Sequence, residues 1–321
     1  MADMKYTVGI DLGGTFIKAG LVEIETRRIL STASVPTNAP RAAELIADDM
    51  ADISKKVCAE GGVEYSEIEF IGVATPGIVK SGVVVAATNL GWENADLAKL
   101  INERTGKTVY VANDANTAAY AEAMWGSGEG ASSLAAFTLG TGVGGGIVLD
   151  GKILEGFNGF AAELGHFVVE PTGRDCGCGK RGCLEAYCSA NALARSAKEA
   201  MLEDKDSAMW QIAGGSLDNV SAKTPFDAKA LGDKAGTAVV ESFINYLAIG
   251  VSNIINIIQP EVVCVGGGVC AQGDNLLVPL REKVGAMSFG VEGGRTRVEI
   301  AKFKNEAGII GAALLGVQEV N

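Results

Sequence analysis

The chain has 321 residues, 48% of them hydrophobic and 21% charged, and a formal net charge of −12. Its length is too great for one small core and fits two lobes, while its apolar and charged fractions are those of an ordinary globular protein. The acidic balance argues against a nucleic acid or an anionic membrane as a partner, because both bind clustered Lys and Arg.

The N-terminal residues MADMKYTVGID enter a predicted strand without the basic and apolar regions of a secretory signal. The longest apolar stretch, residues 243–258, contains three asparagines and a serine, so it is too short and too polar to span a bilayer. We therefore expect a cytoplasmic protein with no membrane partner, in which this stretch forms a buried helix.

The first half of the chain begins with two short apolar runs, residues 8–10 and 16–22, on either side of the turn Gly13-Gly14-Thr15. This pattern predicts a β-hairpin. The apolar pattern then predicts these elements in order: a helix over residues 41–60, a strand over 70–74 running into Thr75-Pro76-Gly77, a helix near 97–104, a strand over 109–111 and a helix over 115–124.

The second half opens in the same way, with residues 134–149 reading as a strand, the turn Gly140-Thr141-Gly142 and a second strand. This match indicates an internal duplication; a chance similarity of two glycine turns is the alternative. The remaining predicted elements are helices near 190–202 and 227–258, a strand over 262–265 ending in Gly266-Gly267-Gly268, and a helix over 307–317. Alternating strands and helices predict an α/β protein with functional residues on loops at strand ends.

The two glycine turns are candidate phosphate-binding loops. Residues 140–145 match the dinucleotide fingerprint, but a strand follows where that motif needs a helix. Residues 146–152 mimic a Walker A loop, but Ile153 stands where Ser or Thr must bind Mg²⁺. Each turn nevertheless offers consecutive backbone N–H groups to polyphosphate oxygens, and Asp11 beside the first turn can orient Mg²⁺ or its waters. Ordinary hairpin turns are the alternative.

The segment between residues 163 and 185 contains the only histidine of the chain and three closely spaced cysteines: His166, Cys176, Cys178 and Cys183. Three thiolates and one imidazole complete the tetrahedron that structural Zn²⁺ prefers, which leaves no open position for a catalytic water. A disulfide fits poorly with seven cysteines and no secretory signal, and unrelated cysteines beside a core histidine are the other alternative. Such an ion would hold Glu163 and Glu185 close together.

Asp114 is the candidate acid for chemistry, because it follows a predicted strand directly. Phosphoryl transfer to an alcohol needs a carboxylate within hydrogen-bond reach of the hydroxyl. The alternative is a cap for the following helix, where Asn and Asp are favoured, and the spacing alone favours that alternative.

Five motifs, in this order, resemble the ROK family of bacterial repressors and sugar kinases: DLGGTFIK (residues 11–18), NDANTAA (113–119), LGTGVGGG (139–146), ELGH (163–166) and CGCGKRGCLE (176–185). The resemblance covers nearly the whole chain and implies an actin-like ATPase fold, with two ribonuclease-H-like lobes of mixed sheets around a central cleft. It implies a small lobe over residues 1–115, completed by 306–321, and a large lobe over 116–305.

The resemblance also implies roles for individual residues, with Asp114 as the general base that accepts the proton of a sugar hydroxyl. Six positions would hold the sugar: Gly77, Asn89, Asn113, Glu163, His166 and Glu185. Nine would hold ATP and Mg²⁺, the last two at the edge of the adenine pocket: Asp11, Gly13, Gly14, Thr15, Lys18, Thr141, Gly142, Gly267 and Gly268. His166 would serve twice, with one ring nitrogen on zinc and the other facing the sugar.

The NLGW segment (residues 89–92) and the length resemble family members that phosphorylate the 6-hydroxyl of glucose. Kinases for N-acetylmannosamine, N-acetylglucosamine, mannose or fructose are the alternatives, and a non-catalytic sugar sensor is a further one. Repressors of the family carry a DNA-binding domain before the kinase-like part, and this chain begins at the first phosphate-loop strand, so we expect no nucleic-acid partner. The resemblance implies a homodimer. We expect loss of zinc to damage sugar binding before nucleotide binding, since each glycine turn has a hairpin of its own.

Overall fold

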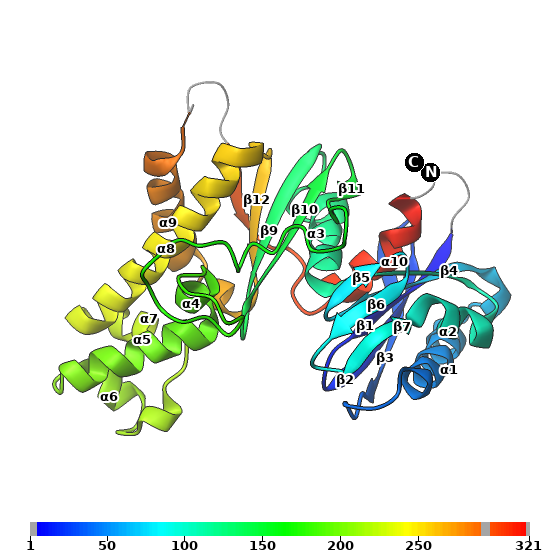
Figure 1. Ribbon diagram of the computed structural model, residues 1–321, viewed down its shortest axis with the longest axis horizontal. Helices are drawn as coiled ribbons and strands as arrows, with labels where there is room; N and C mark the ends of the chain where they lie inside the picture. Colours follow the sequence, from blue (N-terminus) through cyan, green and yellow to red (C-terminus); the bar gives the residue numbers. More distant parts are fainter. Residues whose placement is uncertain (1–4, 290–295, 319–321) are drawn as a thin grey trace. The chain divides into compact units, whose positions relative to one another are not determined.

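The computed structural model describes residues 5–289 and 296–318, which form two compact units (Figure 1). The first unit takes in the described chain up to Ser132, residues 146–162 and the chain from Phe303 onward. The second unit takes in residues 133–145 and 163–302. This grouping differs from the lobes predicted above, whose boundaries at residues 115 and 306 stay a prediction.

The first unit contains a mixed five-stranded sheet in the order β3-β2-β1-β4-β8. Its strands are β1 (Tyr6–Leu12), β2 (Phe16–Glu23), β3 (Arg28–Pro36), β4 (Ile68–Thr75) and β8 (Thr108–Asn113). β1 and β2 form the predicted antiparallel hairpin, and β1, β4 and β8 run parallel. The carboxyl ends of these three strands therefore share one edge of the sheet, which is where ligands bind in open α/β sheets.

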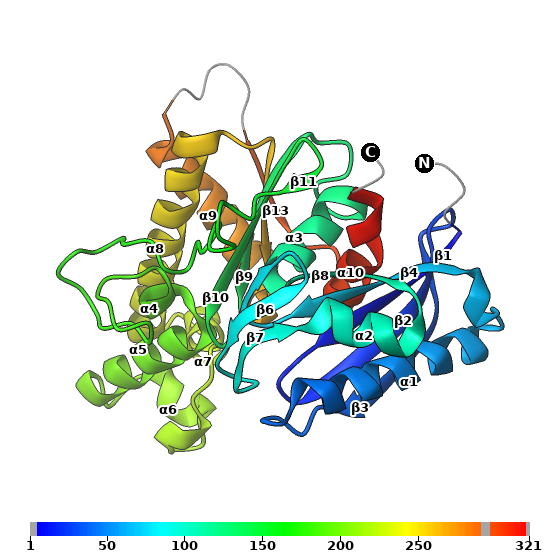
Figure 2. The ribbon, with the colours of Figure 1, turned by 45° about the vertical axis from the view of Figure 1, so that its right-hand side comes forward.

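Helices cover both faces of this sheet, as Figure 2 shows. Side chains alternate between faces along a strand, and Val8 and Ile10 of β1 belong to the core that α1 (Ala43–Gly61) and α2 (Leu97–Thr105) complete. On the opposite face a Cβ on Gly9 would lie 2.0 Å from the carbonyl oxygen of Ile309, in helix α10 (Ala307–Gln318). The backbone of α10 thus lies directly on the sheet, and α3 (Asp114–Trp125) packs beside it.

A small antiparallel sheet, which the sequence analysis missed, projects from the first unit in the order β5-β6-β7. Its strands β5 (Ile78–Lys80), β6 (Val83–Ala87) and β7 (Trp92–Asp96) have three to five residues each. Such short runs give little periodicity to recognise.

The second sheet has the order β11-β10-β9-β12-β13, which repeats the first one position by position and agrees with the predicted duplication. Its strands are β9 (Ser133–Leu139), β10 (Val143–Leu149), β11 (Lys152–Ile153), β12 (Val262–Gly266) and β13 (Arg297–Ile300). β9, β12 and β13 run parallel, as β1, β4 and β8 do.

The second unit has these helices: α4 (Glu185–Cys188), α5 (Ala190–Glu203), α6 (Ala208–Ile212), α7 (Thr224–Ala230), α8 (Lys234–Ile258) and α9 (Asp274–Met287). Short 3₁₀ segments lie at Tyr65–Glu67 in the first unit and at Leu217–Asn219 and Gly268–Gln272 in the second. The single helix predicted over residues 227–258 is wrong at its start, because α7 ends before Gly232 and Asp233 caps a new helix by accepting the N–H of Gly236 at 2.6 Å.

Among the described residues, α8 is the one helix long and apolar enough to cross a membrane. Of its most apolar window, 61% is buried inside the protein, including Phe243, Leu247 and Val251. The stretch predicted as a buried helix therefore has the packing of a core helix.

The contact between α10 and the first sheet gives a stability prediction. A Cβ on Gly72 of β4 would lie 1.8 Å from the carbonyl oxygen of Ala312, so Gly72→Ala forces two backbones apart. We expect unfolding measurements to show a loss of about 1–3 kcal/mol or more. Gly285→Ala is the matched control, because nothing lies within 4 Å of its Cβ position in α9, and it should gain roughly 0.5–1 kcal/mol from helix propensity. Equal stability of the two variants would contradict the packing described here.

Candidate functional site

In the first unit, the predicted phosphate, acid and sugar residues follow the carboxyl ends of adjacent parallel strands. Asp11 of β1 stands opposite Ala74 of β4, and Thr75 of β4 stands opposite Asn113 of β8. The structure therefore brings Asp11, the segment after Thr75 and the Asn113-Asp114 pair to one edge of the sheet.

The first glycine turn is closed by its own backbone and held by a distant threonine. The N–H of Gly13 donates to the carbonyl of Phe16 at 2.9 Å, and Gly14 and Thr15 are exposed. The buried hydroxyl of Thr37 donates to the carbonyl of Gly13 at 2.6 Å. The sequence analysis missed Thr37, which lies outside every motif and meets the turn only through the fold.

Asp11 lies beside this turn as a partly buried carboxylate. Burial raises the pKa of its carboxyl group above the usual value, and Lys18, whose Nζ lies 3.9 Å from Oδ2, offsets only part of that effect. The first turn of α10 also approaches it, since a Cβ on Gly308 would lie 2.8 Å from its Cγ. A carboxylate that lacks full charge compensation fits the predicted role toward a hard cation or its waters.

Asn113, and not Asp114, occupies the N-cap position at the start of α3. Asn113 is the N-cap of α3, because its Oδ1 accepts the N–H groups of Ala115 and Asn116 at 2.9 and 3.1 Å. Its Nδ2 donates to the carbonyl of Gly77 at 2.9 Å, which joins two predicted sugar positions. Asp114 is the first residue of α3, and its side chain is exposed.

The other predicted sugar positions of the first unit belong to the small sheet. Gly77 has φ +94°, and a Cβ there would lie 2.2 Å from the carbonyl oxygen of Ala86 on β6, so only glycine fits. Asn89 is exposed in the turn between β6 and β7. The small sheet thus carries Asn89 and fixes Gly77 next to Asn113.

In the second unit, the second glycine turn and the predicted adenine edge are neighbours. The turn follows β9, and the N–H of Gly140 donates to the carbonyl of Gly142 at 3.0 Å, with Thr141 exposed. β12 runs parallel to β9 and ends one residue before Gly267. Gly267 has φ +94°, and a Cβ there would lie 2.3 Å from the carbonyl oxygen of Leu139, while Gly268 beside it is exposed.

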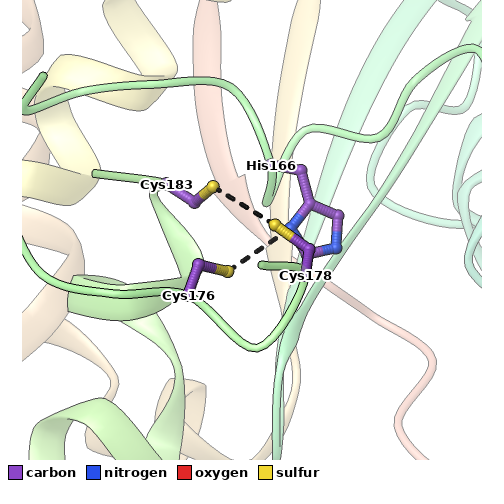
Figure 3. A group of neighbouring side chains, drawn as sticks. All are labelled: His166, Cys176, Cys178 and Cys183. Atoms are coloured by element: carbon purple, nitrogen blue, oxygen red, sulfur yellow. Dashed lines mark hydrogen bonds between the residues drawn. The ribbon is translucent and has the colours of Figure 1, made fainter. Parts of the chain in front are cut away.

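The four predicted metal ligands meet in one place, as Figure 3 shows. Their ligand atoms all lie within 4.8 Å of one another; the residues are His166, Cys176, Cys178 and Cys183. The Sγ atoms of Cys178 and Cys183 are 3.7 Å apart, and Sγ of Cys176 lies 3.7 Å from Nδ1 of His166. Two sulfurs on a tetrahedral zinc with bonds of about 2.3 Å are about 3.8 Å apart. The cluster could therefore hold a metal ion of this kind.

The loop that carries the cysteines has a backbone frame of its own. The N–H of Cys176 donates to the carbonyl of Lys180, and that of Gly182 to the carbonyl of Arg174, both at 2.8 Å. Burial raises the pKa of the Cys176 thiol to about 12, whereas the backbone N–H of Lys180 lowers the pKa of Cys178. Metal binding must displace protons from such thiols, so metal retention should weaken as the pH falls.

The two predicted sugar-binding acids of this unit flank the cluster residues in the sequence. Glu163 is exposed and its carbonyl accepts the N–H of His166 at 3.0 Å. Glu185 begins α4, its N–H donates to the carbonyl of Gly165 at 2.9 Å, and its Oε1 lies 3.6 Å from Sγ of Cys176. Since Nδ1 of His166 faces the sulfurs, Nε2 is the ring nitrogen directed elsewhere.

Comparison with known proteins gives evidence on the family of the chain that does not depend on the geometry of the site. The family model described as ROK family matches residues 7–319. The chain is 38% identical to a glucokinase of Halalkalibacterium halodurans over all of this chain and 97% of the relative. It is also similar to the crystal structure of a ROK family glucokinase from Streptomyces griseus in complex with glucose and AMPPNP, with 34% identity, a TM-score of 0.78, and coverage of 96% of this chain and 98% of the other. A ROK hexokinase structure from Thermus thermophilus has 33% identity and a TM-score of 0.79, covering 98% and 99% of the two chains.

The metal cluster gives a compositional prediction. Freshly purified protein should contain about one zinc per chain by elemental analysis, and Cys178→Ser should lose most of it. Cys188→Ser is the matched control, because that fully buried thiol points to the carbonyl of Phe243 at 3.7 Å and stands outside the cluster. Absence of zinc from unchelated wild-type protein, or its loss in the control variant, would show that the ligand set is wrong.

Proposed function

The chain belongs to the ROK family and has its actin-like fold of two ribonuclease-H-like units, and on that premise we propose that it transfers a phosphoryl group from ATP to the 6-hydroxyl of glucose. The observation that carries the proposal is the placement of Asp114. Its exposed carboxylate begins α3 at the sheet edge that also bears the first phosphate turn and the Asn113–Gly77 contact.

Asp114 acts as the general base in this proposal. Its carboxylate accepts the proton of the 6-hydroxyl while the hydroxyl oxygen attacks the γ-phosphorus of ATP. The bond from that phosphorus to the β–γ bridging oxygen breaks, and ADP leaves. Asn113 caps the helix and fixes the backbone from which Asp114 projects. The hydrogen bond from the side-chain amide of Asn113 to the carbonyl of Gly77 keeps the neighbouring sugar position in a fixed place, so the hydroxyl and the base are oriented before reaction.

The glycine turns bind the polyphosphate of ATP through their backbone N–H groups. The first unit contributes Gly13, Gly14 and Thr15, with Lys18 as a nearby cation, and the second contributes Thr141 and Gly142 beside the adenine edge at Gly267 and Gly268. Bound Mg²⁺ would neutralise charge on the β- and γ-phosphate oxygens. The incompletely compensated carboxylate of Asp11 is the group we assign to it or its waters.

The metal cluster is assigned a structural zinc that orders the sugar side of the second unit. Nδ1 of His166 faces the cluster, which leaves Nε2 for a sugar hydroxyl, and Glu163 and Glu185 supply two carboxylates. Because four protein ligands close the tetrahedron, the ion takes no direct part in phosphoryl transfer.

Glucose is the proposed acceptor because the 38%-identical relative is named a glucokinase and a similar structure holds glucose.

Homodimer formation and a cytoplasmic location are part of the proposal, and sedimentation velocity would test the homodimer. A non-catalytic sensor would keep the sugar site and release no ADP in the presence of glucose.

Replacing the proposed base gives the first functional prediction. Asp114→Asn should leave glucose affinity largely intact while kcat falls about 10²–10⁴-fold, the usual contribution of a positioned general base. Asp274→Asn is the matched control, since Asp274 is also an exposed first residue of a helix, α9, and its variant should keep normal kcat. A coupled assay of ADP release over a range of glucose concentrations gives kcat and the KM for glucose. Near-normal turnover of Asp114→Asn would refute the mechanism.

A sugar panel tests the acceptor. With ATP and Mg²⁺, glucose should have the highest kcat/KM among glucose, mannose, fructose, N-acetylglucosamine and N-acetylmannosamine, by at least about tenfold, or 1.4 kcal/mol of transition-state stabilisation. A higher value for another hexose would replace glucose with that sugar and leave the kinase assignment in place.

A further inference from the structure

Glu185 links the metal cluster to the second phosphate turn. Its Oε2 accepts the N–H of Val143 at 2.9 Å, and Val143 is the residue that directly follows the turn. Its Oε1 lies 3.6 Å from Sγ of the metal ligand Cys176. One carboxylate therefore touches both groups, although the two glycine turns are expected from the sequence to rest only on their own hairpins.

The close approach of Glu185 to the turn depends on glycine. A Cβ on Gly142 would lie 2.4 Å from Oε2 of Glu185, so any other residue there would displace the carboxylate. A Cβ on Gly165, one residue before the ligand His166, would lie 2.0 Å from the carbonyl oxygen of Val143. The first residue of β10 is thus enclosed between the ELGH segment and the Glu185 side chain.

The backbone of Glu185 is attached to the cluster at two points. It lies two residues after the ligand Cys183, and its N–H donates to the carbonyl of Gly165, the neighbour of His166. An ion that binds Cys183 and His166 together therefore fixes both attachments. The other end of the turn is also held by this region, since the N–H of Ala190 at the start of α5 donates to the carbonyl of Gly140 at 2.8 Å.

We infer that Glu185 is a positioning residue for the nucleotide, and that it makes the affinity of the second phosphate turn depend on the metal cluster. The inference rests on the proposed role of that turn in binding ATP. It adds to the predicted contact of Glu185 with the sugar, and it changes the expectation that loss of the ion spares the nucleotide. With the cluster intact, the carboxylate holds the N–H of Val143 and aligns the N–H groups of the turn before the nucleotide arrives.

Calorimetric titration with ADP, and separately with glucose, tests the inference without any turnover. Glu185→Ala should weaken both ligands, with ADP weakened about tenfold or more. Glu185→Gln should keep ADP within about threefold of wild type, because its amide oxygen still accepts the N–H of Val143. Glu163→Ala is the matched control: it removes another predicted sugar-binding acid beside the cluster, so it should weaken glucose and leave ADP unchanged.

Hydrogen exchange gives a readout that a general structural role would not move. The amides of residues 140–143 should exchange faster in Glu185→Ala than in wild type, and Glu185→Gln should restore their protection. Protection of the same peptide should also fall when a chelator removes the ion from wild-type protein, and chelation of Glu185→Ala should weaken ADP no further.

The inference would be overturned if Glu185→Ala bound ADP with wild-type affinity, or if Glu163→Ala lost as much affinity for ADP as Glu185→Ala does. Chelation that weakens ADP equally in wild type and Glu185→Ala would show that the ion acts by another route and would overturn the coupling. A wild-type protein that binds no ADP at all would instead overturn the proposed function.

Discussion

Backbone-to-backbone contact at glycine is the constraint on which both units depend. The 43 glycines of the chain include positions where a single added carbon would overlap a main-chain atom. At Gly9 and Gly72 that atom belongs to α10, which is why the C-terminal helix can lie on the first sheet. At Gly165 it belongs to Val143, which begins the strand after the second phosphate turn. Because the two backbones touch directly, no side chain between them can change its rotamer to absorb a shift. Each contact therefore fixes the two segments in one relative position.

The duplicated sheet explains why each unit carries a glycine turn of the same kind. In each sheet a hairpin precedes two further parallel strands, so a turn and two strand ends share one edge. The same architecture then receives different side chains: the first edge carries Asp11 and Asp114, whereas the second carries Gly267 beside its turn. The two repeats thus carry different groups at equivalent edges, which a common fold permits.

The metal cluster has consequences beyond the loop that contains it. Residues 166–183 hold the ligands, but the hydrogen bonds of Glu185 and Ala190 carry their arrangement to both ends of the turn at residues 140–142. A structural ion in this position would order groups that the proposed function assigns to the substrates, just as outer-shell partners order the ligands of a metal site. The first turn has no such link among the described contacts and relies on Thr37 instead.

The sequence by itself determined the local patterns and the donor sets. Apolar periodicity located most long helices and both hairpins, the spacing of three cysteines and one histidine picked out four residues that meet in one cluster, and the ordered motifs identified the family. These features are readable because each lies within a short stretch or is a residue type with one dominant chemistry. The break between α7 and α8 and the small sheet were missed, since a capped turn and strands of three to five residues interrupt the pattern only briefly.

Only the tertiary structure decided which of these groups touch. Thr37 reaches the first turn across 24 residues, Asn113 reaches Gly77 across 36, and Glu185 reaches Val143 across 42. Each of these side-chain hydrogen bonds joins segments whose own patterns are satisfied without it, so no local signal marks the partner. The sheet register and the glycine contacts bring those segments together. The contact of Glu185 with both the cluster and the turn at residues 140–142 is therefore a property of the fold, while the cluster residues and the turn are each visible in the sequence.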